Sequence, residues 1–162
     1  DGSSVTMRVE AVEEGLRTKV ASLTDGGVDA IVLLCTGEFP SLRSGDVWLI
    51  EPDTVLTGYV VSLFAQVRVG MILPMAGQVD DARVKWRGLA DPIFAFASPY
   101  SDDVEALVAA AYDLVDAGAR ALVLDCMGFS RRHREALRAR GVEVPVLVAN
   151  EVVGGVVRIA FS

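Results

Sequence analysis

The sequence predicts an α/β fold of two Rossmann-like lobes, each built on a parallel sheet. Strand-like apolar runs alternate with amphipathic helices along the chain, and one strand-and-loop pattern occurs twice. Of the 162 residues, 52% are hydrophobic, and the mean hydropathy is +0.42. Parallel strands are buried on both faces, so this apolar content is typical of the fold. No apolar run has the length of a bilayer span and no signal peptide is visible, so we expect a cytoplasmic protein.

The predicted elements follow one another in a regular order. Gly26 and Gly27 end a first helix, whose apolar residues recur at spacings of three and four: Val5, Val9, Val12, Leu16, Val20 and Leu23. A buried strand (30–35), a loop (36–46) and a segment that fits either a strand or a loop (47–52) come next. A helix then begins near Pro52. Further strands are expected at 68–74, 92–97, 121–126 and 144–150, and helices at 78–89, 101–118 (with Ser101 as N-cap), 129–140 and from 151 onward.

An internal repeat joins the two halves of the chain. Residues 25–37, "DGGVDAIVLLCTG", align with residues 116–128, "DAGARALVLDCMG", and seven of thirteen positions are identical. Glycines that end helices and apolar residues that fill strands are common to all αβ units. Packing does not, however, require Cys35 and Cys126 at equivalent places, each with a glycine two residues later. Either both cysteines are buried structural residues, or the repeat serves a chemical purpose.

The position of the cysteines in the repeat favours the chemical purpose. Ligands of open α/β sheets bind at the carboxyl ends of the strands, where the following helix or loop offers free N–H groups. Such groups stabilise a thiolate and attract anions. If the two lobes face each other, Cys35 and Cys126 lie on opposite walls of one cleft, with their sulfurs roughly 7–8 Å apart, and can act as a two-base proton-transfer pair. We therefore expect Cys35 and Cys126 to be catalytic.

The charge of the chain limits its partners. The formal net charge is −7, which argues against a general nucleic-acid binder, since such proteins need a basic surface. One basic stretch, 131–140, contains five arginines and one glutamate, and it is either a solvated helix face or an attractor of an anionic ligand. We expect a small carboxylate or another small anion as ligand, no membrane partner, and a homodimer on the basis of the apolar content.

Other readings of the titratable residues are weaker. A zinc site of Cys35, Cys126 and His133 lacks a fourth ligand, and no metal is expected. His133 is expected on the arginine face, about two helical turns from Cys126, so a hydrolytic nucleophile–base pair of these two residues is the weaker alternative. Asp125 either caps the next helix or orients a neighbour. No G-x-G-x-x-G motif follows a strand, and we expect no cofactor. Four larger residues are assigned to the core or a cleft wall: Trp48, Trp86, Met71 and Met75.

The repeat also suggests how the lobes are divided. The copy around Cys126 follows two strand–helix units, whereas the copy around Cys35 follows a single helix. The amino-terminal strand and helix of the first lobe are therefore expected to be missing. We assign residues 1–66 to this first, incomplete lobe, to which a helix at 151–162 could return, and residues 67–150 to the second lobe.

Three stretches resemble the AroM family: "LDCMGFSRRHREALRARGVEVPVLVAN", "EPDTVLTGYV" and "VGMILP". AroM proteins look like distant members of the aspartate/glutamate/hydantoin racemase superfamily. "CTGEFP" at Cys35 and "DCMGF" at Cys126 are similar to cysteine motifs of that superfamily, although the Asn-Thr pair usual in racemase lobes does not follow "VLLC".

The resemblance implies an active site between two lobes and cofactor-independent racemisation or isomerisation by Cys35 and Cys126. It also implies a set of substrate-binding residues: Thr36, Gly37, Pro74, Gln78, Met127 and Gly128. Two hypotheses follow for the function. One is a racemase or isomerase acting on a small carboxylate or carbonyl compound, and the other is a non-catalytic or regulatory small-anion binding protein on the same scaffold.

Overall fold

The protein is an α/β structure in which helices and parallel strands alternate. The structure, a computed structural model, describes residues 9–101 and 103–161. The elements within these ranges are α1 (Val9–Asp25), β1 (Ala30–Val32), β2 (Trp48–Ile50), α2 (Pro52–Phe64), β3 (Arg68–Leu73), the 3₁₀ helix η1 (Ala76–Gln78), α3 (Val79–Lys85), β4 (Asp91–Phe96), α4 (Glu105–Asp116), β5 (Ala121–Leu124), α5 (Arg131–Ala139), β6 (Val146–Val148) and α6 (Ala149–Phe161). The predicted α/β class is confirmed, and the ambiguous segment 47–52 contains a strand, β2.

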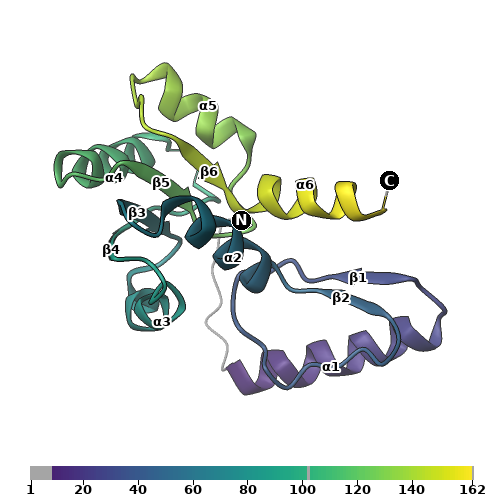
Figure 1. The fold of residues 1–162 in the computed structure, drawn as a ribbon. Coiled ribbons are helices and arrows are strands. Elements are labelled where there is room, and N and C mark those ends of the chain that lie inside the picture. Colours follow the sequence, from purple (N-terminus) through teal and green to yellow (C-terminus); the bar gives the residue numbers. More distant parts are fainter. Residues whose placement is uncertain (1–8, 102, 162) are drawn as a thin grey trace.

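The strands form two separate sheets, and every strand pair in the described residues is parallel. One sheet pairs β1 with β2, and the other has the order β4-β3-β5-β6 (Figure 1). Leu73 pairs with Phe96, and Leu124 pairs with both Ile72 and Val148. The four carboxyl ends of the larger sheet therefore meet at one edge, where ligand-binding loops of α/β proteins lie.

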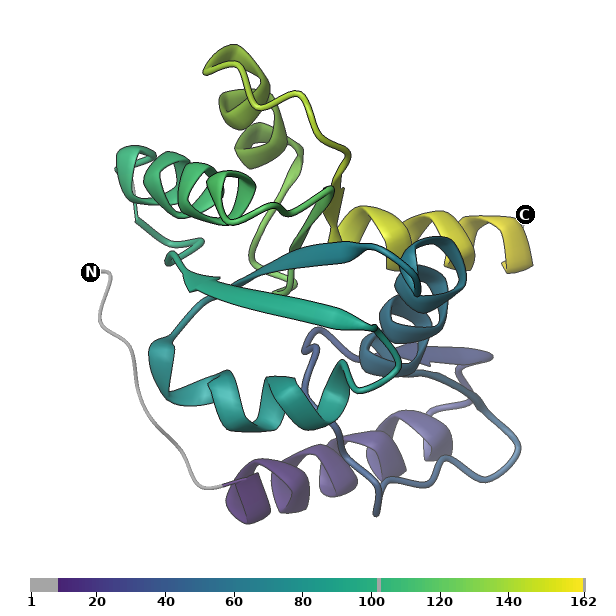
Figure 2. The same ribbon diagram turned by 60° about the vertical axis from the view of Figure 1, so that its left-hand side comes forward.

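Helices cover both faces of the four-stranded sheet, as Figures 1 and 2 show. Alternate strand residues such as Ile72 and Leu124 pack against α4 and α5, while Met71 and Val123 pack against α2 and α3. Gly70 lies where α4 approaches β3 closely, because a Cβ atom there would stand 3.0 Å from Leu114 Cβ of α4. The sheet is buried on both sides, which explains the continuous apolar runs of its strands.

The two-stranded sheet carries a smaller core. Helix α1 runs alongside it (Figure 1), and Val12 and Leu16 of α1 pack against a cluster formed by Leu33, Phe39 and Leu42. The apolar stripe predicted for α1 is thus its packing face; Val5, assigned to the same stripe, lies outside the described residues. Two residues, Leu33 and Leu34, separate the end of β1 from Cys35, so this cysteine lies in the loop beyond the strand.

The internal repeat of the sequence is also a repeat in three dimensions. Gly27 and Gly118 have positive φ angles of 75° and 92°, and each donates its N–H to the carbonyl three residues earlier. These glycines end α1 and α4, after which β1 and β5 begin. The first cysteine loop leads directly to a strand and a helix, β2 and α2, whereas in the second copy α5 precedes the corresponding β6 and α6.

Some local expectations differ from the structure. Ser101 does not cap α4; its Oγ accepts the N–H of Asp103, and α4 begins after Val104. Trp86 and Met71 are core residues, whereas Trp48 is 69% exposed and Met75 is also exposed. None of the helices in the described part of the chain combines the length and apolar character that a membrane span needs.

Candidate functional site

Cys35 and Cys126 occupy equivalent positions, each just after a strand of a different sheet. The N–H of Gly37 donates to Cys35 Sγ at 3.4 Å, and the N–H of Gly128 donates to Cys126 Sγ at the same distance. The glycine two residues after each cysteine therefore supports the sulfur in the same way. Cys35 is exposed and Cys126 is partly buried, and neither forms a disulfide.

The charge of Cys35 acts on the ionisation of Cys126. Burial raises the pKa of Cys126, and negative charge on Cys35 raises it further, while the Gly128 N–H opposes these effects. The separation of 7–8 Å between the two sulfurs stays a prediction.

Tyr100 also belongs to this group, although sequence analysis did not identify it. It lies in the loop after β4, at the same sheet edge as Cys126, and its side chain is exposed. The negative charge of Cys126, and more weakly that of Cys35, raises the pKa of Tyr100. The only signal in the sequence is its place directly after an apolar strand, in "PIFAFASPY".

Asp125 is a buried polar anchor and not a helix cap. Lys85 Nζ donates to Asp125 Oδ1 at 2.8 Å, and Trp86 Nε1 donates to Oδ2 at 2.8 Å. The reason lies in the strand: the N–H of Asp125 still pairs with the Ile72 carbonyl, so the side chain points to the face that α3 covers. The N-cap of α5 is Ser130. Of the two predicted roles for Asp125, orienting a neighbour is the one that fits.

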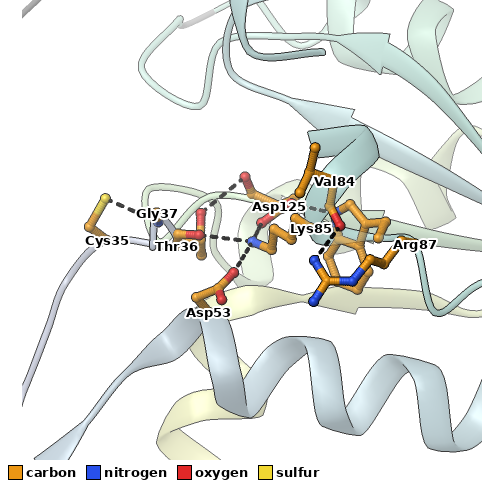
Figure 3. Close-up of polar contacts among 9 residues, drawn as sticks. Cys35, Thr36, Gly37, Asp53, Val84, Lys85, Arg87 and Asp125 are labelled. Atoms are coloured by element: carbon orange, nitrogen blue, oxygen red, sulfur yellow. Dashed lines mark hydrogen bonds and ion pairs between the residues drawn. The ribbon is translucent and has the colours of Figure 1, made fainter. Parts of the chain in front are cut away.

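Lys85 connects the two cysteine-bearing segments (Figure 3). Besides Asp125, its ammonium donates to the Thr36 carbonyl at 2.9 Å and pairs with Asp53 Oδ1 at 3.2 Å. Sequence reasoning missed both Lys85 and Asp53. A signal was present, because Ala82, Lys85 and Trp86 share one helix face, and a lysine on a buried face needs a partner.

The predicted binding residues next to Cys35 and Cys126 form contacts within the protein. Thr36 is partly buried, and its Oγ1 lies 3.5 Å from the Asp125 carbonyl. The carbonyl of Met127 accepts the side-chain N–H of Asn150, at the start of α6, at 3.4 Å. Gly37 and Gly128 support the sulfurs, as described above. These residues thus hold the two cysteine loops in place, and Asn150 is a further contact that the sequence did not indicate.

Pro74 and Gln78 lie at the same sheet edge, just after β3. Both are partly buried, and Gln78 directly precedes α3. No hydrogen bond within residues 9–101 and 103–161 joins either of them to a cysteine. Their role in binding a substrate stays a prediction.

His133 is a structural residue on the buried side of α5, and the prediction that it lies on the arginine face is wrong. Its Nδ1 accepts the Ser130 N–H at 2.9 Å, and its ring stacks edge-to-face on Phe129. Burial and then the Arg132 charge lower the pKa of His133. Its Nδ1 thus completes a capping box at the start of α5. No cluster of three or more metal-binding side chains occurs in the part of the chain that the structure describes.

The arginines of α5 mostly pair with carboxylates of the same chain. Arg131 and Arg134 bind Glu151 at the start of α6, and Arg140 binds Glu105. These pairs hold α5 against its neighbours and leave less positive charge for a ligand. The solvated helix face is therefore the better description of this stretch.

The family model for AroM protein matches residues 1–160. The chain belongs to the AroM family. No curated protein matches the sequence.

Solved structures similar to the AroM chain share its fold at low sequence identity. Unliganded arylmalonate decarboxylase matches with a TM-score of 0.67 and 15% identity over 96% of this chain and 78% of its own. A glutamate racemase from Bacillus anthracis matches with a TM-score of 0.69 and 14% identity over 94% and 65% of the two chains. Picrophilus torridus aspartate racemase gives 0.62 and 11% over 91% and 68%. The AroM chain therefore has the racemase-like fold that the sequence motifs implied.

Proposed function

We propose that this AroM chain is a cofactor-independent racemase or isomerase that moves a proton at a carbon next to a carboxylate or carbonyl group. Cys35 and Cys126 are the acid/base pair. The observation that carries the proposal is the matched geometry of the two thiols, each of which accepts a glycine N–H at 3.4 Å.

The reaction requires one thiolate and one thiol at the same time. Burial raises the pKa of Cys126, so Cys126 starts as the protonated acid. In this direction the Cys35 thiolate removes the proton, which breaks a C–H bond and forms an S–H bond. The electron pair moves into the adjacent carboxylate or carbonyl group, and Cys126 then donates its proton to the opposite face. The atoms balance without any further reactant, and the reverse reaction exchanges the two roles.

The structural neighbours support this chemistry by analogy. Their names describe decarboxylation of an arylmalonate and racemisation of glutamate and aspartate, all carboxylic acids. Shared fold does not fix function, so the thiol geometry carries the argument and the neighbours select the substrate class. Thr36, Gly37, Met127 and Gly128 directly follow the two cysteines in the sequence and are the proposed contacts for the substrate carboxylate.

Deuterium exchange at the α-carbon tests the proposal directly. The protein is incubated in D₂O with a panel of amino, hydroxy and arylmalonic acids, and loss of the α-proton is followed by NMR. Cys35→Ser and Cys126→Ser are each expected to slow racemisation by at least about 100-fold, the usual contribution of a general acid or base. Asp116→Asn, an exposed change at the far end of α4, is the matched control and should leave the rate unchanged.

The outcomes separate catalysis from simple binding. Exchange that depends on both cysteines supports the proposal. If the wild-type chain binds acids from the panel but exchanges no α-proton, the chain is a binding protein and the proposal is wrong. Exchange that survives loss of both thiols would also contradict it.

A further inference from the structure

The ammonium group of Lys85 joins three segments that are distant in sequence. It donates to Asp125 Oδ1 at 2.8 Å and to the Thr36 carbonyl at 2.9 Å, and it forms an ion pair with Asp53 Oδ1 at 3.2 Å. Figure 3 shows the nitrogen between these oxygens. Thr36 directly follows Cys35, and Asp125 directly precedes Cys126. A single side chain thus connects the backbone beside one thiol to the strand end beside the other.

A lysine ammonium has three donors and no acceptor. Two N–H groups of Lys85 donate to Asp125 and Thr36, and the charge of the ammonium is paired with the Asp53 carboxylate. The Lys85 side chain is also only 10% exposed, which leaves little access to the ligand. The arrangement fits a structural connector and not an acid or base of the reaction.

The cluster is buried in a way that stability alone does not explain. The Asp53 side chain is 13% exposed and that of Asp125 is 3% exposed. One cation and two carboxylates leave a net charge of −1 in this buried cluster. Removing such ions from water is expensive, and apolar residues of similar volume are often as stabilising or more so. What a buried ion cluster adds, and an apolar contact does not, is a defined position for each partner.

Trp86 fixes the other end of the connection. Its Nε1–H donates to Asp125 Oδ2 at 2.8 Å, and its ring is fully buried in the core between α2, α3 and the larger sheet. Asp125 is therefore held from both carboxylate oxygens. Lys85 and Trp86 are adjacent, so the end of α3 acts as a rigid base for the contact to Thr36.

Few other polar contacts hold the Cys35 loop to the larger sheet. Thr36 Oγ1 lies 3.5 Å from the Asp125 carbonyl, at the outer limit of a hydrogen bond. Leu34 and Cys35 themselves are exposed. The charged contact from Lys85 to the Thr36 carbonyl is thus the strongest polar link in this region, because hydrogen bonds from charged donors are about twice as strong as neutral ones.

We propose that Lys85 is a positioning residue, which holds the Cys35 loop at one place relative to Cys126. The inference deepens the proposed function and rests on it for its purpose, since a two-thiol reaction needs a fixed distance between the sulfurs. Its structural content can be tested without any turnover.

Cross-linking of the two cysteines measures their relative position. The folded chain is treated with bifunctional thiol reagents of graded length. Mass spectrometry then quantifies two products: the chain with one reagent bridging both cysteines, and the chain in which each cysteine carries a separate reagent. The wild type is expected to show one preferred length. In Lys85→Met, the cross-linked fraction at that length should fall by about tenfold or more, since a freed loop lowers the effective concentration of one thiol near the other.

Two matched variants show whether the effect belongs to the contact with Thr36. Asp53→Asn removes one partner of Lys85 but keeps the contacts to Thr36 and Asp125. This variant should therefore cross-link best with the same reagent length as the wild type. Lys19→Met removes an exposed lysine of α1 and should also behave as wild type. If Lys85→Met does not fold because two carboxylates lose their counter-ion, Lys85→Met with Asp53→Asn leaves a single carboxylate, still held by Trp86, and should show the same tenfold loss.

The failure of this inference is distinguishable from failure of the proposed function. If the Lys85 variants cross-link at the wild-type length and yield, the positioning role is wrong, whatever the activity. If α-proton exchange is absent but cross-linking depends on Lys85, the positioning role holds and the racemase proposal fails. Where exchange is found, Lys85→Met should lower kcat much more than it changes KM, because the substrate contacts remain while the thiol position is lost.

Discussion

Gly128 packs directly against the hydroxyl group of Tyr100. A Cβ atom at Gly128 would lie 2.7 Å from the Tyr100 hydroxyl oxygen and 2.9 Å from Pro99 Cγ. Real side chains do not approach so closely, so the glycine is what allows the tyrosine to lie beside Cys126. The second glycine of the repeat, Gly37, has more room: its Cβ would meet Cys35 Sγ at 3.5 Å, an ordinary contact.

Gly128→Ala should displace Tyr100 from Cys126 without unfolding the chain, because the exposed tyrosine can move outward. The charge of Cys126 would then no longer raise the pKa of Tyr100, and that pKa should fall toward its ordinary value of 10.0. NMR of ¹³C-labelled tyrosine across a pH titration measures this. Gly37→Ala is the control and should leave the Tyr100 titration unchanged; an unchanged titration in Gly128→Ala would contradict the packing argument.

Cys126 should react with iodoacetamide only at higher pH than an ordinary cysteine, because burial raises its pKa. Below the pKa the thiol is neutral and unreactive, so the alkylation rate rises as pH increases through it. In Cys35→Ser the midpoint should move to lower pH, since the charge on Cys35 no longer opposes ionisation of Cys126. Alkylation followed by peptide mass spectrometry measures both midpoints. Identical midpoints in the two proteins would mean that the thiols are not coupled.

Trp86→Phe should destabilise the chain by about 1–3 kcal/mol, because a carboxylate oxygen of Asp125 loses its donor while it stays buried. Urea unfolding followed by circular dichroism measures the free energy of unfolding. Trp48→Phe is the matched control: Trp48 is largely exposed, and its replacement should cost no more than about 0.5 kcal/mol. If both variants lose the same free energy of unfolding, the Trp86 N–H does not have the role that is proposed for it.

The stability of the protein should fall as pH decreases below about 6.5, the ordinary pKa of histidine. The pKa of His133 in the folded protein is lowered, mainly by burial. Just below pH 6.5 the histidine is therefore protonated in the unfolded chain but still neutral in the folded one. The contribution is present above pH 6.5 and is lost as pH falls toward the folded pKa. His133 is the only histidine of the chain, so His133→Gln should remove this slope just below pH 6.5 in urea titrations. A slope that survives in the variant would assign it to other groups.

The alternation of helices and strands was predictable because it depends on local pattern. Apolar spacing marked α1 and α4, and positive-φ glycines such as Gly27 and Gly118 ended them where expected. Segment 47–52 was ambiguous because its apolar run is too short to separate a strand from a loop, and pairing with β1 makes it a strand. A helix cap was one of the two roles predicted for Asp125 because the preference of Asp for helix starts is local, whereas its actual partners lie at the end of α3.

The cysteine loops could be predicted from the sequence, whereas the contacts that connect them could not. The repeated cysteine and glycine lie two residues apart, so each sulfur–amide contact forms within one loop, and comparing two short stretches of sequence was enough to find it. Lys85, Asp53 and Tyr100 join the same site from segments 26 to 73 residues away from Cys126. Their partners depend on strand order and on which face each helix covers, and these follow from packing of the whole chain, which no short stretch of sequence contains.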